Sequence, residues 1–221
     1  MKTFRLLASF VIFGGVAAGC LAQIAQKKGG FIFRVHYTPG QVLKLDSTMT
    51  FINRGSDPAG TVKASTTLKV LTVSKGIANV EMLVTPGVLA GTKTQVTPAQ
   101  KMVLRLDDKN RSADKKELGG GMIALPARPM NPGSTWKTYL PLKDPSGVIQ
   151  TLTAIYRFSG ISNENGHQVA VVTYILSGFA NGTGAMKLLV KDGSLYSNIT
   201  NLSLTSGSTV SKVQTVVKRI Q

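Results

Sequence analysis

The stretch TPGQVLKLDSTMTF (Thr38–Phe51) decides the fold class of this chain. The stretch opens with Pro-Gly, which predicts a turn. Proline fixes the φ angle that such a turn needs, and glycine tolerates the positive φ angle of the next position. Apolar and polar side chains then alternate, and the apolar members on one face are Leu43, Leu45, Met49 and Phe51. Alternation with a period of two predicts a β-strand with one apolar face and one face in water.

A second stretch, NPGSTWKTYLP (Asn131–Pro141), opens with the same Pro-Gly turn and leads into a similar run of residues. Hairpin signals follow each of the two turns. TTLKVLTV and IANVEMLV are separated by Ser74-Lys75-Gly76, and LTAIYRFSGI and HQVAVVTYILSGF are separated by a turn that contains Asn165-Gly166. Short gaps of turn-forming residues between β-branched runs predict antiparallel hairpins.

Corresponding features recur in the same order in the two parts of the chain. Gly133 follows Gly40 by 93 positions, and Val80 in the third run matches Val171 by its place in the pattern. We therefore predict a diverged duplication of a β-meander of about 90 residues, with loop insertions that change the offset. The alternative is that any antiparallel protein shows a similar alternation.

The predicted organisation has four parts. A signal peptide covers 1–22, a first β-meander half 31–114, a linker rich in glycine and proline 115–131, and a second β-meander half 132–221. The run TPAQKMVLRL (97–106) starts like a helix, but we predict a strand because the repeat requires one. The fold class is therefore all-β, or nearly so, after an N-terminal signal helix. Two related antiparallel halves form a sandwich, a curved sheet or a half-barrel.

The first 22 residues have the features of an export signal. Two basic residues give a charged start, Leu6–Val16 form an apolar core, and small residues follow. The segment Ala17-Ala18-Gly19-Cys20 resembles the site at which bacterial lipoproteins are lipidated, which makes Cys20 a candidate lipidation site. A cut after Ala22 and a retained membrane anchor are the alternatives. The signal predicts an exported protein in the periplasm, attached to the outer membrane, or outside the cell.

The charge balance of the chain is strongly basic. Lysine and arginine total 26 against 10 aspartate and glutamate residues, and loss of the two basic residues of the signal leaves a net charge of +14. This charge favours anionic partners, which in an exported protein are lipid headgroups or acidic envelope polymers. Nucleic acid is not an expected partner, because aromatic residues are only 6% of the sequence and are not interleaved with the basic ones.

The sequence shows no constellation of catalytic or metal-binding residues. Cys20 is the only cysteine, so the mature chain has no internal disulfide and no thiolate metal cluster. His36 and His167 each stand alone, whereas a zinc site needs three or four ligands. Asp107-Asp108 and Asp114 lie in a turn-like region. We therefore expect no enzymatic activity, no metal and no cofactor.

Two further motifs have structural explanations at this level. Gly182-Thr183-Gly184 has too few glycines, and no following helix, to hold a phosphate group. Trp136 and Tyr139 are candidates for stacking on a sugar or for entering a membrane interface. We expect Trp136 to pack in the core beside its turn instead.

Four features together carry a resemblance to a known class of proteins. They are the export signal, PGSTWK (Pro132–Lys137), LVKDGSLYSN (Leu189–Asn198) and the closing run STVSKVQTVVKRI. With them the mature chain resembles a class of uncharacterised exported bacterial β-proteins, which implies a strand that begins at the Gly-x-x-Trp motif and assigns no activity and no site residue. A looser likeness is to lipoprotein-carrier half-barrels, which hold acyl chains on a curved sheet.

These observations predict a non-enzymatic exported envelope protein. Of the three arrangements, a curved sheet has an apolar concave side that suits an apolar or amphipathic ligand, and the basic charge suits an anionic envelope surface. The alternative is a structural or protein-interaction module that docks on another envelope protein by a sheet edge or a surface patch.

Overall fold

The structure is a computed structural model that describes residues 22–53, 60–96, 99–113, 124–143, 149–191, 193–206 and 209–220. These residues form strands, turns and loops and contain no helix, which confirms the all-β prediction. None of them therefore belongs to a helix that could cross a membrane. The predicted signal helix lies outside the described residues except for Ala22, and Cys20 lies outside them too.

The described strands are β1 (Ala22–Lys27), β2 (Gly30–Val35), β3 (Val42–Asn53), β4 (Gly60–Ser74), β5 (Ile77–Val84), β6 (Val88–Leu89), β7 (Gln100–Leu106), β8 (Thr135–Lys143), β9 (Ile149–Glu164), β10 (His167–Gly178), β11 (Ala180–Leu189), β12 (Leu195–Ser206) and β13 (Thr209–Arg219).

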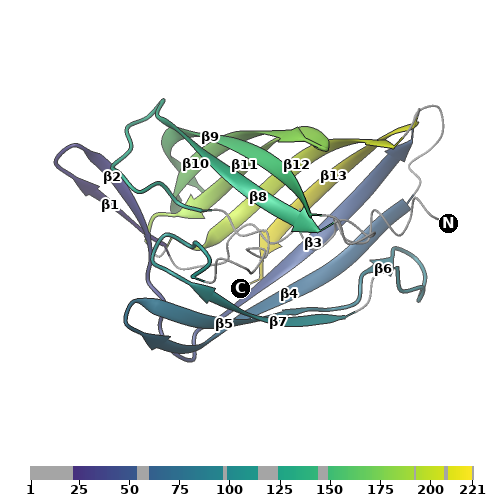
Figure 1. Cartoon of the computed structure of the whole chain (residues 1–221), viewed down its shortest axis with the longest axis horizontal. Helices are drawn as coiled ribbons and strands as arrows, with labels where there is room; N and C mark the ends of the chain where they lie inside the picture. The colour runs from purple at the N-terminus through teal and green to yellow at the C-terminus, as the bar shows by residue number, and fades with distance from the viewer. Residues whose placement is uncertain are drawn as a thin grey trace.

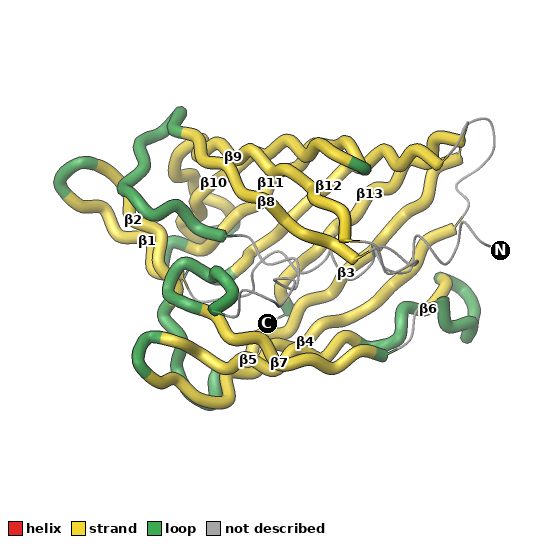
Figure 2. Tube along the Cα trace, viewed as in Figure 1, coloured by secondary structure: helices red, strands yellow, loops and turns green. Residues whose placement is uncertain are grey.

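One antiparallel sheet contains most of these strands, in the order β7-β5-β4-β3-β13-β12-β11-β10-β9-β8, with β6 paired to β4. The sheet curls strongly, so that in Figure 1 β8 passes in front of other strands of the same sheet. Strands make up most of the described trace (Figure 2). Its edge strands, β7 and β8, do not pair with each other, so the sheet stays open. A single curved sheet is therefore the arrangement observed, and the segments predicted as two halves join edge to edge through β3 and β13.

The alternation predicted for residues 41–51 is present in β3. The side chains of Leu43, Leu45, Met49 and Phe51 are at most 6% exposed, on the inner face of the sheet. The intervening Lys44 and Asp46 are exposed on the outer face. Because successive side chains of a strand point to opposite faces, a period of two in the sequence becomes one buried and one wet surface.

The two Pro-Gly turns have the same geometry. Their glycines adopt positive φ angles, 82° at Gly40 and 91° at Gly133. Each glycine N–H donates to a carbonyl oxygen of the next strand, to Val70 at 2.8 Å and to Phe158 at 2.7 Å. The N–H of that same strand residue donates back to the residue after the glycine, at 2.9 and 3.0 Å respectively. Equivalent bonds thus fix β3 against β4 and β8 against β9.

A β-bulge follows each of these contacts at the corresponding place. The extra residue is Leu71 in β4 and Ser159 in β9, directly after the residue that bonds the Pro-Gly turn. By this register Val80 corresponds to Val172, one residue beyond the Val171 that the sequence pattern suggests. A bulge at matched positions gives the two parts of the sheet the same local bend.

The hairpins after the bulges end in matched turns as well. The two central residues have φ angles of 50° and 77° at Lys75-Gly76, and of 48° and 80° at Asn165-Gly166. Positive φ at both positions defines the tight turn that suits the right-handed twist of paired strands. The strands β3, β4 and β5 thus share the turn and bulge geometry of β8, β9 and β10, and a duplication of the two parts stays a prediction.

Three segments bridge the gap between the edge strands at one end of the sheet: β2, the turn at 107–113, and residues 124–134. We call them the end cap. Phe31 and Met130 exchange backbone hydrogen bonds of 2.8 Å, the N–H of Val35 donates to Asp108 at 2.7 Å, and the N–H of Leu125 donates to Lys109 at 2.8 Å. The described part of the predicted linker, 124–131, thus bonds to both neighbouring segments. Figure 1 shows β1 and β2 at the end where β4 turns into β5, which we call the capped end.

Candidate functional site

The side chains on the inner face of the sheet form a broad, buried apolar core. Its side chains come from all the long strands and pack into one cluster with the end cap. No charged side chain is among the buried residues that the structure describes. The least exposed large members are Tyr156, Phe33, Phe158, Leu45, Met82, Leu106, Met130, Met186, Leu188, Leu195 and Val62.

Four polar side chains form a patch within this apolar face: Tyr174, Asn198, Thr200 and Thr215. The hydroxyl of Tyr174 donates to Asn198 Oδ1 at 2.9 Å and is also hydrogen-bonded to Thr200 Oγ1. Thr215 pairs with Thr200 across the strands and is 1% exposed, and its hydroxyl has no partner in the described structure. Buried polar groups are nearly always hydrogen-bonded, so this hydroxyl suits a water molecule or a polar group of a ligand.

Two glycines of β11 lie where a side chain would have no space, and one of them faces the patch. Gly184 lies directly opposite Tyr174, and a Cβ atom added there would collide with the tyrosine ring and stand 2.6 Å from the carbonyl oxygen of Ile199. A Cβ atom at Gly182 would lie 2.8 Å from a methyl group of Leu202. These glycines therefore serve close packing inside a strand.

An aromatic row continues the inner face towards the edge strand β8. The Trp136 ring stacks on Tyr156, with centroids 5.0 Å apart and planes 19° apart, and Tyr156 lies 5.6 Å from Tyr174. The indole N–H of Trp136 donates to the carbonyl of Ala124 at 3.0 Å. Trp136 thus packs against the core as expected, whereas Tyr139 is 63% exposed.

Burial raises the pKa of both inner tyrosines above the ordinary value near 10. For Tyr174 the hydrogen bonds to Thr200 and Asn198 act in the opposite direction but do not cancel the effect of burial. A buried phenol resists ionisation because the phenolate loses its hydration. The patch therefore stays neutral, and it offers hydrogen bonds without charge.

We expect the fold to lose stability in alkali because of these tyrosines. Above pH 10 the unfolded chain releases phenolic protons that the native state keeps, so stability is complete below pH 10 and falls as the pH rises. Each such group contributes a slope of about 1.4 kcal/mol per pH unit. Urea unfolding at pH 8 to 11 measures it. Tyr156→Phe reduces the slope, and a slope equal to that of the wild type in this variant would contradict the assignment.

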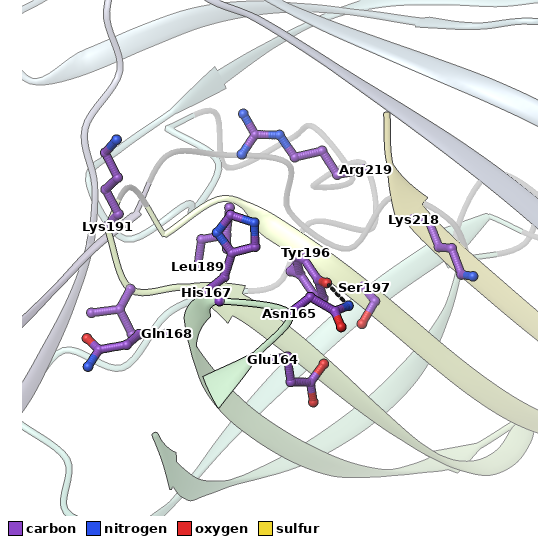
Figure 3. A pocket seen from close by; sticks show the side chains of 12 residues that line it. Glu164, Asn165, His167, Gln168, Leu189, Lys191, Tyr196, Ser197, Lys218 and Arg219 are labelled. Atoms are coloured by element: carbon purple, nitrogen blue, oxygen red, sulfur yellow. Dashed lines mark hydrogen bonds between the residues drawn. The ribbon is translucent and has the colours of Figure 1, made fainter. Parts of the chain in front are cut away.

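A pocket of about 1000 Å³ lies at the capped end, where β9 to β13 begin or end. We call it the end pocket, and Figure 3 shows its side chains. The Nδ2 group of Asn165 donates to the hydroxyl of Tyr196 at 3.0 Å, and the rings of Tyr196 and His167 lie 6.0 Å apart. The lining residues are Glu164, Asn165, Gly166, His167, Gln168, Leu189, Val190, Lys191, Tyr196, Ser197, Lys218 and Arg219.

Basic side chains from two strand ends that are distant in the sequence line this pocket. Lys191, Lys218 and Arg219 line it, and Lys187 forms an ion pair with the lining residue Glu164. Arg219 donates to the hydroxyl of Ser194. Because one carboxylate is matched by Lys187, the described lining carries an excess of positive charge.

The histidines considered in the sequence are not brought together. His36 is exposed and lies outside the end pocket, which His167 lines. Within the described residues, no group of three or more His, Cys, Asp and Glu side chains is placed to hold a metal ion. Asp114 lies outside the described residues.

Asp107 holds a turn together. Its Oδ1 accepts the backbone N–H groups of Lys109 and Arg111, each at 2.9 Å, and its Oδ2 accepts Arg111 Nε at 2.8 Å. Burial raises the pKa of Asp107, but these hydrogen bonds outweigh burial and hold the pKa below its usual value. Asp108 forms ion pairs with Arg34 and Lys109, both at 3.1 Å. Asp107 and Asp108 therefore stabilise the turn at 107–113, which is part of the end cap.

Comparison with known proteins leaves the fold and the two sites as the basis for function. No protein-family model matches the chain. No curated protein matches it either.

Proposed function

We propose that this chain is a non-enzymatic exported envelope protein that binds an apolar or amphipathic ligand on the inner face of its open sheet. The observation that carries the proposal is a curved, unclosed sheet with a continuous apolar inner face. Concave apolar surfaces with a few convergent polar groups are the usual form of small-molecule sites. The four-residue polar patch provides such groups.

The open seam between the edge strands supports the same reading. β7 and β8 are bridged by the end cap at one end of the sheet and do not pair along their lengths. A seam without a hydrogen-bond ladder separates at a lower free-energy cost than paired strands do. It therefore offers a route by which a ligand reaches the inner face.

The edge strands themselves are poor templates for another chain. Lys101 and Arg105 are exposed on β7, and Lys137 is exposed on β8. β8 also contains Pro141, which has no N–H to donate. Charges and proline on edge strands discourage pairing with foreign strands, so ligand binding is favoured over docking by strand addition.

Delipidated protein is expected to take up a fluorescent fatty acid saturably. The bound probe also raises the free energy of unfolding, by about 2.7 kcal/mol when its free concentration is one hundred times Kd. Fluorescence titration and urea unfolding in the presence of the probe measure the two effects. Absence of both saturation and stabilisation would refute the proposal.

A pair of substitutions locates the binding surface. Ala154→Phe adds bulk on the inner face, where Ala154 is 0% exposed, and is expected to weaken uptake at least tenfold. Thr173→Phe adds the same ring on the outer face, where Thr173 is exposed, and leaves uptake unchanged. Circular dichroism confirms that each variant is folded. Should Ala154→Phe not fold, the thermal shift that the probe gives to the wild type remains decisive.

A further inference from the structure

We propose that the end pocket binds a phosphate-bearing headgroup, so that the ligand is an anionic amphiphile. This inference rests on the proposed function and names the chemical class of the ligand. The size, the charge and the hydrogen-bonding groups of the pocket support it.

The pocket has the size of an organic headgroup. Its volume of about 1000 Å³ is at the upper end of the range typical of small-molecule sites, and it far exceeds the space that a bare ion fills. Five neighbouring strands contribute to its wall, because the β9–β10 and β11–β12 turns lie at the same end of the sheet. The shape is therefore set by the sheet and not by one loop.

The charge of the pocket selects an anion. In Figure 3 Lys191, from the turn after β11, and Lys218 and Arg219, which are neighbours in β13, lie on different sides of His167 and Tyr196, and the side chains of Lys191 and Lys218 extend away from the two rings. Among the ion pairs between described residues, none involves Lys191 or Lys218. Asp192 follows Lys191 in the sequence and lies outside the described residues. Lysine and arginine side chains that line one cavity are the usual partners of phosphate oxygens.

Neutral donors complete the site. The hydroxyl of Tyr196 accepts a hydrogen bond from Asn165, so its own proton is directed to another acceptor. A phosphate has several acceptor oxygens and can use both the hydroxyl and the cationic groups. Leu189 and Val190 give the same cavity an apolar wall, against which the part of an amphiphile next to its headgroup can pack.

The test compares three probes on the full chain: dodecyl phosphate, dodecanol and inorganic phosphate. We expect dodecyl phosphate to bind at least ten times more tightly than dodecanol, and the difference to shrink in 0.5 M NaCl because salt screens the charges. Inorganic phosphate is expected to bind much more weakly than dodecyl phosphate. Isothermal titration calorimetry measures all three affinities.

Two double variants separate the pocket from the general charge of the protein. Lys191→Gln with Lys218→Gln is expected to weaken dodecyl phosphate about tenfold and to leave dodecanol unchanged. Lys63→Gln with Lys69→Gln removes two exposed lysines of β4, which contributes no residue to the pocket, and leaves both affinities unchanged.

The outcomes distinguish the headgroup site from the proposed function. Equal binding of dodecyl phosphate and dodecanol overturns the headgroup site while uptake on the inner face stands. Equal loss in both double variants also overturns it, because the effect then comes from net charge. Inorganic phosphate that binds as tightly as dodecyl phosphate assigns the pocket to the free ion and overturns the amphiphile. If neither amphiphile binds, both proposals fall.

Discussion

The Gly184→Ala variant is expected to unfold with a free energy about 3 kcal/mol below that of the wild type, because its methyl group has no space. The added Cβ atom would stand 2.6 Å from the carbonyl oxygen of Ile199 on the neighbouring strand and would collide with the ring of Tyr174. Backbone on one side and a buried ring on the other leave little room for adjustment. Urea unfolding followed by circular dichroism measures the loss.

Companion variants identify the cause of this loss. Thr183→Ala changes the neighbouring exposed residue and is expected to alter stability by less than about 0.5 kcal/mol. Tyr174→Leu shortens the opposing side chain, so combined with Gly184→Ala it should restore part of the stability in a double-mutant cycle. The same leucine should not rescue Gly182→Ala, since Asn201 and Leu202 obstruct that position. A Gly184→Ala protein as stable as Thr183→Ala would show that the two strands are not packed this closely.

Phe33→Ala is expected to cost about 3 to 5 kcal/mol, the range for large aromatic side chains removed from a core. The Phe33 ring is 0% exposed, and its centroid lies 5.2 Å from that of Phe158 and 6.3 Å from that of Trp136. These contacts attach β2 to β8 and β9, whereas Val35 bonds the turn after β7. Loss of the ring therefore removes the contacts that hold the end cap against β8 and β9.

Hydrogen exchange tests the location of that effect. In Phe33→Ala the amides of Phe31 and Met130, which bond each other, should exchange faster than those of β3. Ile32→Ala removes a half-buried neighbour and is expected to cost less than half as much. If the two variants lose equal stability, the aromatic contacts are not what holds β2.

The strands of the sheet were predictable because their signal is local. Residues 41–51 alternate strictly, and Asn165-Gly166 tolerates the positive φ that its turn requires, so both follow from the residues themselves. The choice between sandwich and curved sheet was not predictable, because it depends on the pairing of β3 with β13. That pairing joins residues near opposite ends of the chain, and no local pattern reports it.

The residues of the candidate sites were harder to predict for the same reason. Gly182 and Gly184 gave no usable signal until Tyr174 was placed opposite them. Lys191 is far in the sequence from the adjacent pair Lys218 and Arg219, and they line one pocket only because alternate turns of a meander lie at one end of the sheet. The order of the hairpins in the sequence does predict which turns share an end of the sheet. It places the Asn165-Gly166 turn at the same end as the turn after β11. The hairpin of β1 and β2 had no predicted element over residues 22–30.

The pairing of β3 with β13 also orders events in time. Hairpins of β3 to β5 can close as soon as they are synthesised, but β3 then presents a bare row of backbone groups until the last strand has been made. Contacts between residues so distant in the chain form slowly. Throughout this delay the incomplete sheet has an unpaired edge strand, and such edges lead partly folded β proteins to aggregate. The synthesis of β13 thus decides when the growing chain stops exposing the unpaired edge of β3.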